Sequence, residues 1–451
     1  MKLYRIIFNT ALLTVLAITA AAQGKNPRVD LKETRLANGL RVITVEDHST
    51  PVIALDITYQ VGSRNERQGR TGFAHLFEHM MFKGSENVGT GEQYVLIFNN
   101  GGTMNGTTNE DRTTYFEALP SNQLDMALFI EADRMRSLVI NKANLDNQRN
   151  AVQEERRLGV DNQAYGQSGE VQQGLIYDNF AYKHTVIGSM DDLNAASVED
   201  VASFFKMYYA PNNAVLVLVG DFKTADALRK IKQSFESIPR QPDPPAVDMT
   251  EPAQTAERRA TVEDALARLP QVDIGFKAVP GNTADFYALQ VLSAALQSGQ
   301  SSRLYQALVK DKQMVTTVGG LMDEKVGTGA LYTSATLRSG VKTDDVEKAI
   351  YDEVERLKKD GIADWELQKA KNTTRRNFIN GLQSSIGRSV NIGTWTAYYG
   401  DVNLINTRLS KVDAVTKADV QRVANKYLVQ TNRTVVVTVP KPKPAAATTQ
   451  Q

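Results

Sequence analysis

The chain of 451 residues contains no cysteine, which excludes disulfide bonds, thiolate metal ligands and cysteine nucleophiles. Histidine is scarce as well: only His48, His75, His79 and His184 could supply imidazole chemistry. A formal net charge of +1 provides no basic field for binding nucleic acid. The rest of the composition, 42% hydrophobic and 23% charged, is that of a globular protein, and the length predicts two or three domains.

The first 22 residues have the features of a secretory signal peptide. Lys2 and Arg5 precede an apolar stretch at 11–18, and Ala20-Ala21-Ala22 provides an Ala-x-Ala exit. The apolar stretch is short for a membrane span. We therefore expect cleavage after residue 22, no membrane span in the mature chain and export to the periplasm, with secretion as second choice. The alternative is a retained N-terminal anchor.

The remaining chain has an internal repeat. Ser197 and Thr416 lie 219 positions apart, and each is followed in the same register by Asp-Val, Tyr and Asn. Capping chemistry explains part of this match, but not all of it. We therefore predict a duplicated α+β domain, with domains at 23–240 and 263–439, a proline-rich linker at 241–262 and a disordered tail at 440–451.

Hydrophobic patterning predicts the elements of the first half. Strands are expected at 40–45, 52–61, 113–118 and 214–219, and helices from residue 71 and at 123–138, 142–158 and 198–209.

One motif carries chemistry: His75-Leu76-Phe77-Glu78-His79. On a helix, His75 and His79 share a face and can bind one metal ion, and Glu78 can reach a water molecule at that metal. This is the inverted form of the His-Glu-x-x-His zinc helix. The alternative is a surface helix with two solvated histidines. The apolar neighbours of the motif indicate a buried helix instead, where unpartnered imidazoles would be costly. We therefore predict one zinc ion per chain.

A catalytic zinc needs a third protein ligand. His48, in a turn before a proline, and His184, in a polar stretch, are expected to be surface residues. A carboxylate on the helix at 142–158 is the better source, because Glu155 continues the less charged face of that helix. The alternative for Glu155 is a surface ion pair with an arginine. We favour such a pair for Glu154.

The sequence resembles the insulinase/pitrilysin family of inverzincin peptidases, in the branch of mitochondrial processing peptidase and its short bacterial relatives. The resemblance extends over nearly all of residues 30–440. It rests on the following positions: Val61-Gly62-Ser63, Gly69, Thr71 to Met80, Phe82-Lys83-Gly84, Gly101-Gly102, Asn105, Thr108, Asp111, Tyr115-Phe116, Tyr209 to Asn213, Gly220-Asp221-Phe222 and Ser301-Ser302-Arg303-Leu304.

This resemblance implies two homologous domains, each a mostly antiparallel sheet with helices packed on one side. It implies His75, His79 and Glu155 as zinc ligands and Glu78 as general base. Asn105-Gly106-Thr107 would line the sheet edge where a peptide adds as an extra strand; for Asn105, a plain turn residue is the alternative. The implied activity is that of a zinc metalloendopeptidase acting on peptides or unfolded polypeptides. The rival function is a non-catalytic peptide-binding or structural subunit of the same fold.

The chain departs from the family pattern in two places. Family members often carry an acidic residue where this sequence has Gln148, whose amide can support Glu155 by a hydrogen bond but adds no charge. Val309 and Thr316 occupy the register of an Arg and a Tyr that hold the substrate in active members, and residues 185–451 contain no histidine. We therefore expect a heterodimer in which a zinc-less homologous subunit supplies the Arg/Tyr pair.

Overall fold

The structure, a computed structural model, describes residues 28–441. The predicted signal peptide at 1–22 and the predicted tail from residue 442 onward lie outside the described residues.

The first sheet has six strands in the order β1-β2-β6-β3-β5-β4. They are β1 (Lys32–Arg35), β2 (Arg41–Glu46), β3 (Val52–Tyr59), β4 (Thr103–Thr108), β5 (Thr113–Pro120) and β6 (Ala214–Gly220). Only β2 and β6 pair in parallel. Strand β4 lies at the edge, as predicted for 105–107.

The second sheet has five strands in the order β7-β11-β8-β10-β9. They are β7 (Arg258–Asp264), β8 (Gln271–Pro280), β9 (Val315–Met322), β10 (Thr328–Leu337) and β11 (Arg433–Pro440). Only β7 and β11 pair in parallel, so both sheets are mostly antiparallel, as predicted.

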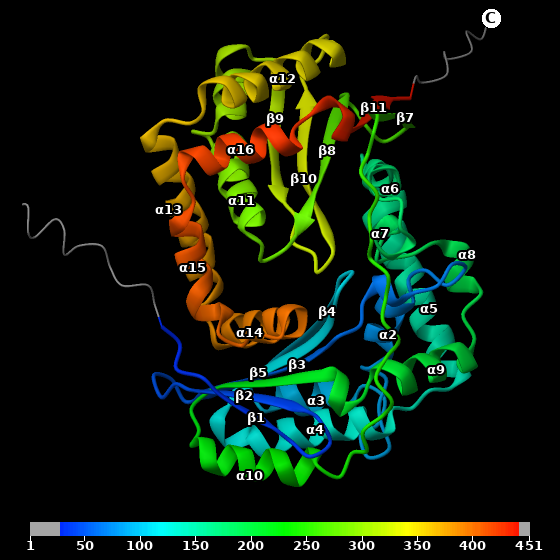
Figure 1. The fold of residues 1–451 in the computed structure, drawn as a ribbon. Helices are drawn as coiled ribbons and strands as arrows, with labels where there is room; N and C mark the ends of the chain where they lie inside the picture. The colour runs from blue at the N-terminus through cyan, green and yellow to red at the C-terminus, as the bar shows by residue number, and fades with distance from the viewer. Residues whose placement is uncertain (1–27, 442–451) are drawn as a thin grey trace, which may run out of the picture.

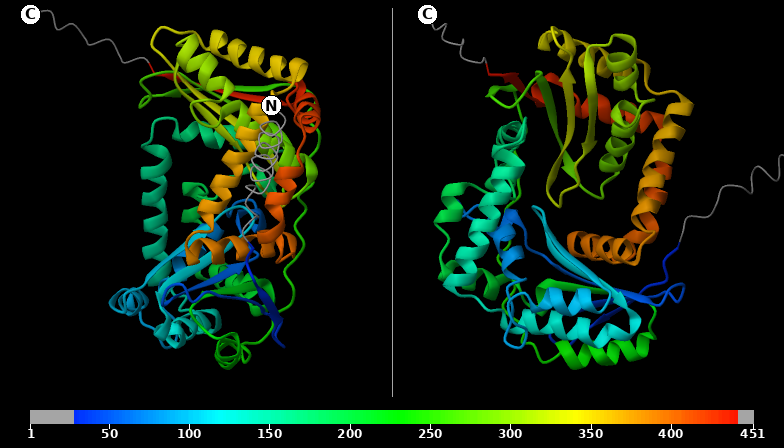
Figure 2. Two further views of the ribbon diagram at one scale, coloured as in Figure 1. Left: turned by 90° about the vertical axis from the view of Figure 1, so that its left-hand side faces the viewer. Right: turned by 180° about the vertical axis from the view of Figure 1, so that it is seen from behind.

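Helices fill the remainder of each half. The first half has α2 (Phe73–Met80), α3 (Glu92–Asn99), α4 (Leu124–Ser137), α5 (Lys142–Arg156), α6 (Gly166–Ile176), α7 (Phe180–Lys183), α8 (Met190–Asn194), α9 (Val198–Tyr208) and α10 (Thr224–Phe235). The second half has α11 (Ala284–Gln297), α12 (Thr343–Asp360), α13 (Asp364–Gly381), α14 (Ser385–Tyr399), α15 (Leu404–Ala414) and α16 (Lys417–Tyr427). The two sheets lie at opposite ends of the molecule, with α13 and α15 along one side and α6 along the other (Figure 1). The same arrangement is visible from the side and from behind (Figure 2).

The predicted repeat is visible as matching contacts. Ser197 caps α9 and Thr416 caps α16, each in a capping box with an aspartate. After α9, Asn213 Nδ2 donates to Tyr208 O at 2.8 Å, and after α16 the equivalent asparagine makes the same 2.8 Å bond to Tyr427 O. The strands that follow, β6 and β11, then occupy corresponding positions in the two sheets.

The halves exchange one helix each, which the sequence analysis did not anticipate. Helix α14 packs on β3, β5 and β6 of the first sheet, and α6 packs on β7, β8 and β11 of the second. All seven residues of β6 are buried, so the first sheet must be covered on both faces. Ile392 and Trp395 of α14 cover the face that carries Val217. The prediction of helices on one side of each sheet therefore holds only for helices of the same half. The other side of each sheet is covered by a helix from the other half.

Two predicted boundaries need correction. Strand β7 begins at Arg258, so the end of the predicted linker at 241–262 is paired with β11. Pro440, predicted to begin a disordered tail, is the last residue of β11 and pairs with Asp264. Both segments are polar, which favours a linker and a tail, but strand pairing through the backbone does not need apolar side chains on both faces.

Candidate metal centre

The predicted motif helix is α2, and its burial follows the apolar pattern of the sequence. Phe73, Leu76, Phe77 and Met80 are buried in the core of the first half, which fixes the helix against its neighbours. His75 and His79 are half-buried on the side of the helix that faces α5. Their ring centroids are 4.8 Å apart, so the spacing of four residues does bring both imidazoles together.

The third predicted ligand joins them from α5. Glu155 Oε2 lies 3.6 Å from His75 Nε2 and 3.4 Å from His79 Nε2. Ligand atoms about 2.0–2.1 Å from a tetrahedral zinc ion lie about 3.4 Å from one another, so these spacings fit zinc. Among the ion pairs of the described residues, Glu155 contacts the two imidazoles and no arginine. The alternative of a surface ion pair with an arginine is therefore not supported.

The protonation of the cluster also suits a metal. Burial, followed by the charge of His79, lowers the pKa of His75 to about 4. Burial also lowers the pKa of His79. Both rings are therefore neutral near pH 7, which is the form that binds metal ions. The Glu155 side chain is 53% exposed, so the cluster opens to solvent on that side.

Glu78 lies beside the cluster and is itself buried. Thr108 Oγ1, at the end of β4, donates to Glu78 Oε2 at 2.6 Å. Burial raises the pKa of Glu78 to about 7, although the Thr108 hydrogen bond opposes this shift. A carboxylate that exchanges its proton near neutral pH suits a general base. Sequence reasoning did not assign Thr108 this role; its place two residues after Gly106, on the same face of a strand, was the available signal.

The edge strand β4 runs directly past Glu78. A Cβ atom at Gly106 would lie 3.1 Å from Glu78 Cγ and 3.2 Å from Phe82 Cε2, so only glycine fits without displacing them. Because Asn109 N donates to Arg112 O, the alternation of an antiparallel ladder places the N–H and C=O of Gly106 on the open edge. The Gly106 N–H donates to Asn105 Oδ1 at 2.9 Å. The side chains of Asn105 and Thr107 are exposed.

Two neighbours of the ligands are arranged as follows. Glu154 is exposed and pairs with Arg157 at 3.0 Å, as predicted. Gln148 Nε2 donates to Asn147 Oδ1 at 2.6 Å. This hydrogen bond does not reach Glu155, so the support of Glu155 by Gln148 stays a prediction.

The remaining histidines differ from each other. His48 is exposed and contacts Asp221 Oδ1 at 2.6 Å, in agreement with its prediction as a surface residue. The same prediction for His184 is wrong, because only 12% of its side chain is exposed and its Nε2 lies 2.9 Å from Glu66 Oε2. The polar sequence around His184 hid this burial, because two of its partners, the Glu66 carboxylate and the Ser63 carbonyl, come from a distant segment.

Residues 41–168 match the family described as Insulinase (Peptidase family M16), and residues 195–374 match the domain described as Peptidase M16 inactive domain. A relative named zinc protease PqqE, from Helicobacter pylori, is 32% identical over 441 residues, which cover 96% of this chain and 97% of the relative. The chain belongs to the insulinase family of peptidases. A probable mitochondrial-processing peptidase subunit beta from Arabidopsis thaliana is 24% identical over 413 residues, covering 88% of this chain and 76% of the relative.

Solved structures of the family share the fold. A protease from Helicobacter pylori matches with a TM-score of 0.87 and 31% identity, covering 92% of this chain and 100% of that chain. The periplasmic protease PqqL from Escherichia coli matches with a TM-score of 0.73 and 18% identity, covering 93% of this chain and 50% of that chain. Within residues 28–441, no helix is both long and apolar enough to cross a membrane.

The two positions that depart from the family pattern lie in the second half. Val309 lies on the short π-helix at Tyr305–Asp311 and packs against the core of the second half. Thr316 is exposed on β9, and its Oγ1 donates to Thr336 O at 3.1 Å. Both side chains thus make local contacts within the second half.

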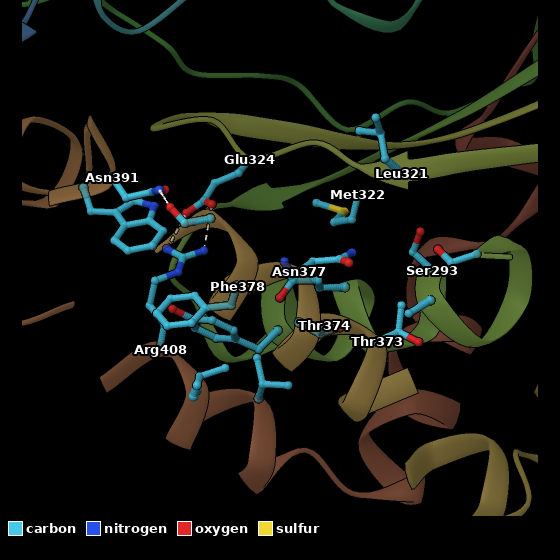
Figure 3. A pocket seen from close by; sticks show the side chains of 18 of the residues that line it. Ser293, Leu321, Met322, Glu324, Thr373, Thr374, Asn377, Phe378, Asn391 and Arg408 are labelled. Atoms are coloured by element: carbon cyan, nitrogen blue, oxygen red, sulfur yellow. Dashed lines mark hydrogen bonds and ion pairs between the residues drawn. The ribbon is translucent and has the colours of Figure 1, made fainter. Parts of the chain in front are cut away.

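A pocket of about 410 Å³ also lies in the second half. It is lined by α11, α13, α14, α15 and the end of β9, and the ion pair between Arg408 and Glu324 closes one side of it (Figure 3). None of the residues of the metal centre lines this pocket. The candidate site is therefore the open cluster on α2 and α5 beside β4.

Proposed function

We propose that this chain is a zinc-dependent metalloendopeptidase that hydrolyses peptides or unfolded polypeptides. The observation that carries the proposal is the cluster of His75, His79 and Glu155, whose ligand atoms all lie within 4.8 Å of one another. The buried carboxylate of Glu78 beside the cluster supports a hydrolytic role over a structural metal site.

The residues of the chain divide the work of hydrolysis. A zinc ion held by the three ligands would supply Lewis acidity, which polarises the peptide carbonyl and makes water a stronger nucleophile. Glu78 accepts a proton from the attacking water and delivers it to the amine that leaves. Thr108 holds the Glu78 carboxylate in place through its 2.6 Å hydrogen bond. The open edge of β4 aligns an extended substrate by main-chain hydrogen bonds, so folded proteins are excluded.

We further propose that the chain is the metal-bearing subunit of a heterodimer. Val309 and Thr316 cannot supply the Arg and Tyr that the family uses opposite the metal, and a zinc-less homologous subunit would supply them. The relative named as a processing-peptidase beta subunit supports a two-subunit arrangement. The signal-peptide pattern at 1–22 supports a periplasmic location, and the neighbour titled periplasmic protease PqqL agrees with it.

A non-catalytic peptide-binding or structural subunit is the second candidate, and the residues at 309 and 316 favour it. Glu78→Gln, compared with Glu154→Gln as the matched exposed control, separates the two functions. Cleavage of a quenched peptide is measured with and without the product of the neighbouring gene, and zinc content is measured in each sample. We expect Glu78→Gln to keep zinc and to lose hydrolysis by a factor on the order of 10² to 10⁴. If the wild-type chain binds zinc but cleaves no peptide, either alone or with the second gene product, the second candidate is supported.

A further inference from the structure

The helix that bears the metal ligands begins without a capping side chain of its own. Its N-cap residue is Gly72, at φ 85°, yet the first N–H groups of a helix need acceptors. Glu66 supplies them: its carboxylate accepts from Gly72 N at 3.0 Å and from Ala74 N at 2.7 Å. The Glu66 side chain is fully buried, and the helix dipole favours a negative charge at this end.

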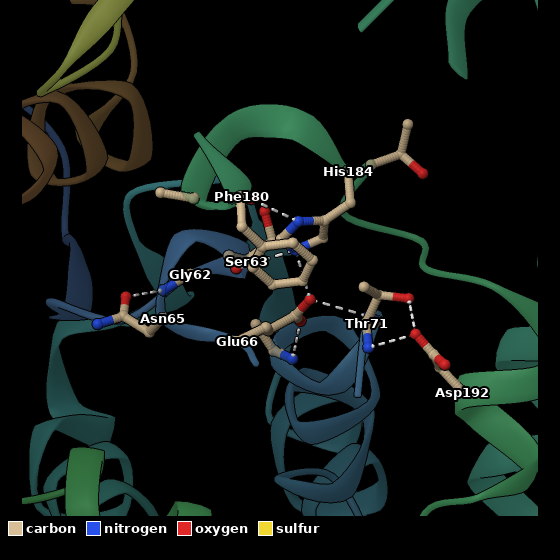
Figure 4. Close-up of polar contacts among 12 residues, drawn as sticks. Gly62, Ser63, Asn65, Glu66, Thr71, Phe180, His184 and Asp192 are labelled. Carbon is tan, nitrogen blue, oxygen red and sulfur yellow. Dashed lines mark hydrogen bonds and ion pairs between the residues drawn. The ribbon is translucent and has the colours of Figure 1, made fainter. Parts of the chain in front are cut away.

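His184 faces Glu66 from the end of α7 (Figure 4). Its Nε2 lies 2.9 Å from Glu66 Oε2 and 3.1 Å from Ser63 O, and its Nδ1 lies 2.9 Å from Phe180 O. All three partners are acceptors, and a neutral imidazole carries only one N–H. Only the doubly protonated ring can donate from both nitrogens. The Phe180 ring stacks on it at 4.4 Å between centroids.

The electrostatic surroundings agree with a cation. Burial alone would lower the pKa of His184, but the hydrogen bond and charge of Glu66, together with the hydrogen bonds to Phe180 O and Ser63 O, outweigh it, so the pKa is raised. Burial also raises the pKa of Glu66, and the hydrogen bond and charge of His184 oppose this rise. The charged groups around the ring are Glu66 and Arg64 near Ser63, Lys183 on α7, Glu170 on α6 and Glu110 in the turn after β4. Three of these groups already have ion-pair partners: Arg64 pairs with Asp111, Glu170 with Arg156, and Glu110 with Lys325. Glu66 is thus the carboxylate left to His184.

The segment that carries His184 touches both helices of the metal centre. Beyond His184, Asp192 Oδ2 accepts from Thr71 N at 2.9 Å, next to the start of α2. On the other side, Arg149 Nε of α5 donates to Leu193 O at 3.0 Å. Residues 184–193 therefore connect the start of α2 to α5, the helix that carries the third ligand.

We propose that His184 is a positioning residue of the metal centre: its imidazolium holds Glu66 against the start of α2 and thereby fixes His75 and His79 relative to Glu155. This inference rests on the proposed function, because it presupposes zinc at that cluster.

The first test measures zinc affinity of the full chain at pH 7 by competition with a chelator. We expect His184→Ala to weaken zinc binding by about tenfold, in the range found for residues that orient metal ligands. His184→Lys, which restores a cation with several donors, should recover most of the affinity, whereas His184→Gln should not. His48→Ala is the matched control at an exposed histidine and should bind zinc like the wild type.

The second test follows the His184 ring by NMR in the wild type, assigned by comparison with His184→Gln. A doubly protonated ring at pH 7, with a midpoint that falls in Glu66→Gln, is the expected result. Zinc affinity should then decrease as the pH rises through this midpoint, and His184→Lys should lack that decrease. A ring that is neutral at pH 6 would overturn the inference, even if His184→Ala failed to fold. Equal zinc affinity of folded His184→Ala and the wild type would also overturn it, whereas a wild type without zinc affinity would defeat the proposed function itself.

Discussion

Asp56 is a buried carboxyl group that should make the first half less stable as the pH rises. It lies on β3 beneath α14, where a Cβ atom at Gly393 would be 2.2 Å from Asp56 Oδ2. Its partners are two hydroxyls: Thr58 Oγ1 donates at 2.9 Å and Thr114 Oγ1 at 2.5 Å. Burial raises its pKa from 3.8 to about 7. Protonation of Asp56 therefore stabilises the folded state relative to the unfolded state.

The sign and size of the effect follow from linkage. Because the folded pKa is above the unfolded one, the stabilisation is complete below about pH 4 and is lost as the pH rises to about 7. The shift corresponds to about 4 kcal/mol above pH 7, of which about 2–3 kcal/mol develops between pH 5 and pH 8. Asp56→Asn keeps a polar group but cannot ionise. Its stability relative to the wild type should therefore rise by about 2–3 kcal/mol over that pH interval.

Tryptophan fluorescence provides the assay. Trp395 of α14 is 9% exposed and packs on the first sheet, whereas Trp365, the second tryptophan, is 62% exposed. Urea titrations at pH 5 and pH 8 thus report the release of α14 from the sheet that contains Asp56. Asp226→Asn, at a side chain that is 66% exposed, is the control and should show no such pH dependence. A constant stability difference between Asp56→Asn and the wild type at the two pH values would refute the reasoning.

Three further outcomes are expected. Gly106→Val places side-chain atoms against Glu78 and Phe82, so peptidase activity should fall by about a hundredfold while zinc content is kept; Gly169→Ala, in open space, is the control. Zinc at a hundred times its dissociation constant should stabilise the protein by about 2.7 kcal/mol. A chelator should remove both this stabilisation and the activity. A melting temperature that zinc leaves unchanged would contradict zinc binding at the proposed ligand cluster. Lys325 Nζ lies 2.7 Å from both Glu110 Oε1 and Asp323 Oδ2. Lys325→Met should therefore lower the free energy of unfolding, measured in urea, by about 3–5 kcal/mol. A decrease below about 1 kcal/mol would show that these carboxylates are not buried with the lysine.

The parts of the candidate metal centre that depend on residue spacing within one helix could be predicted from the sequence. The parts that depend on how distant segments pack could not. A spacing of four residues on a helix brings His75 and His79 together in any fold, so the sequence alone identified that pair. Glu155 depends on how α5 packs against α2, and helical periodicity could only favour it over Glu154. Glu66 and His184 reach the site through loops, and hydrophobic patterns carry no information about such contacts.

The helix exchange was hidden for a different reason. The run Ala214–Gly220 is apolar at nearly every position, which indicates a strand covered on both faces. That pattern predicts a second cover but does not say which segment provides it. Gly393 allows α14 to approach the sheet closely enough to do so, yet a single glycine in a helix gives no such signal.

Described residues of the second half support Glu78, the proposed general base, although the candidate metal cluster lies entirely in the first half. Thr108, which bonds Glu78, is followed directly by the turn at 109–112. Asn109 Nδ2 of this turn donates to Tyr398 Oη of α14 at 2.7 Å, and Asp111 Oδ2 accepts from Val326 N of the loop after β9 at 2.9 Å. The end of the edge strand is thus fixed by two segments of the other half. Because the proposed metal ligands lie on α2 and α5, a substitution at these contacts should reduce hydrolysis and leave zinc affinity intact, whereas a substitution of His184 should weaken zinc binding itself.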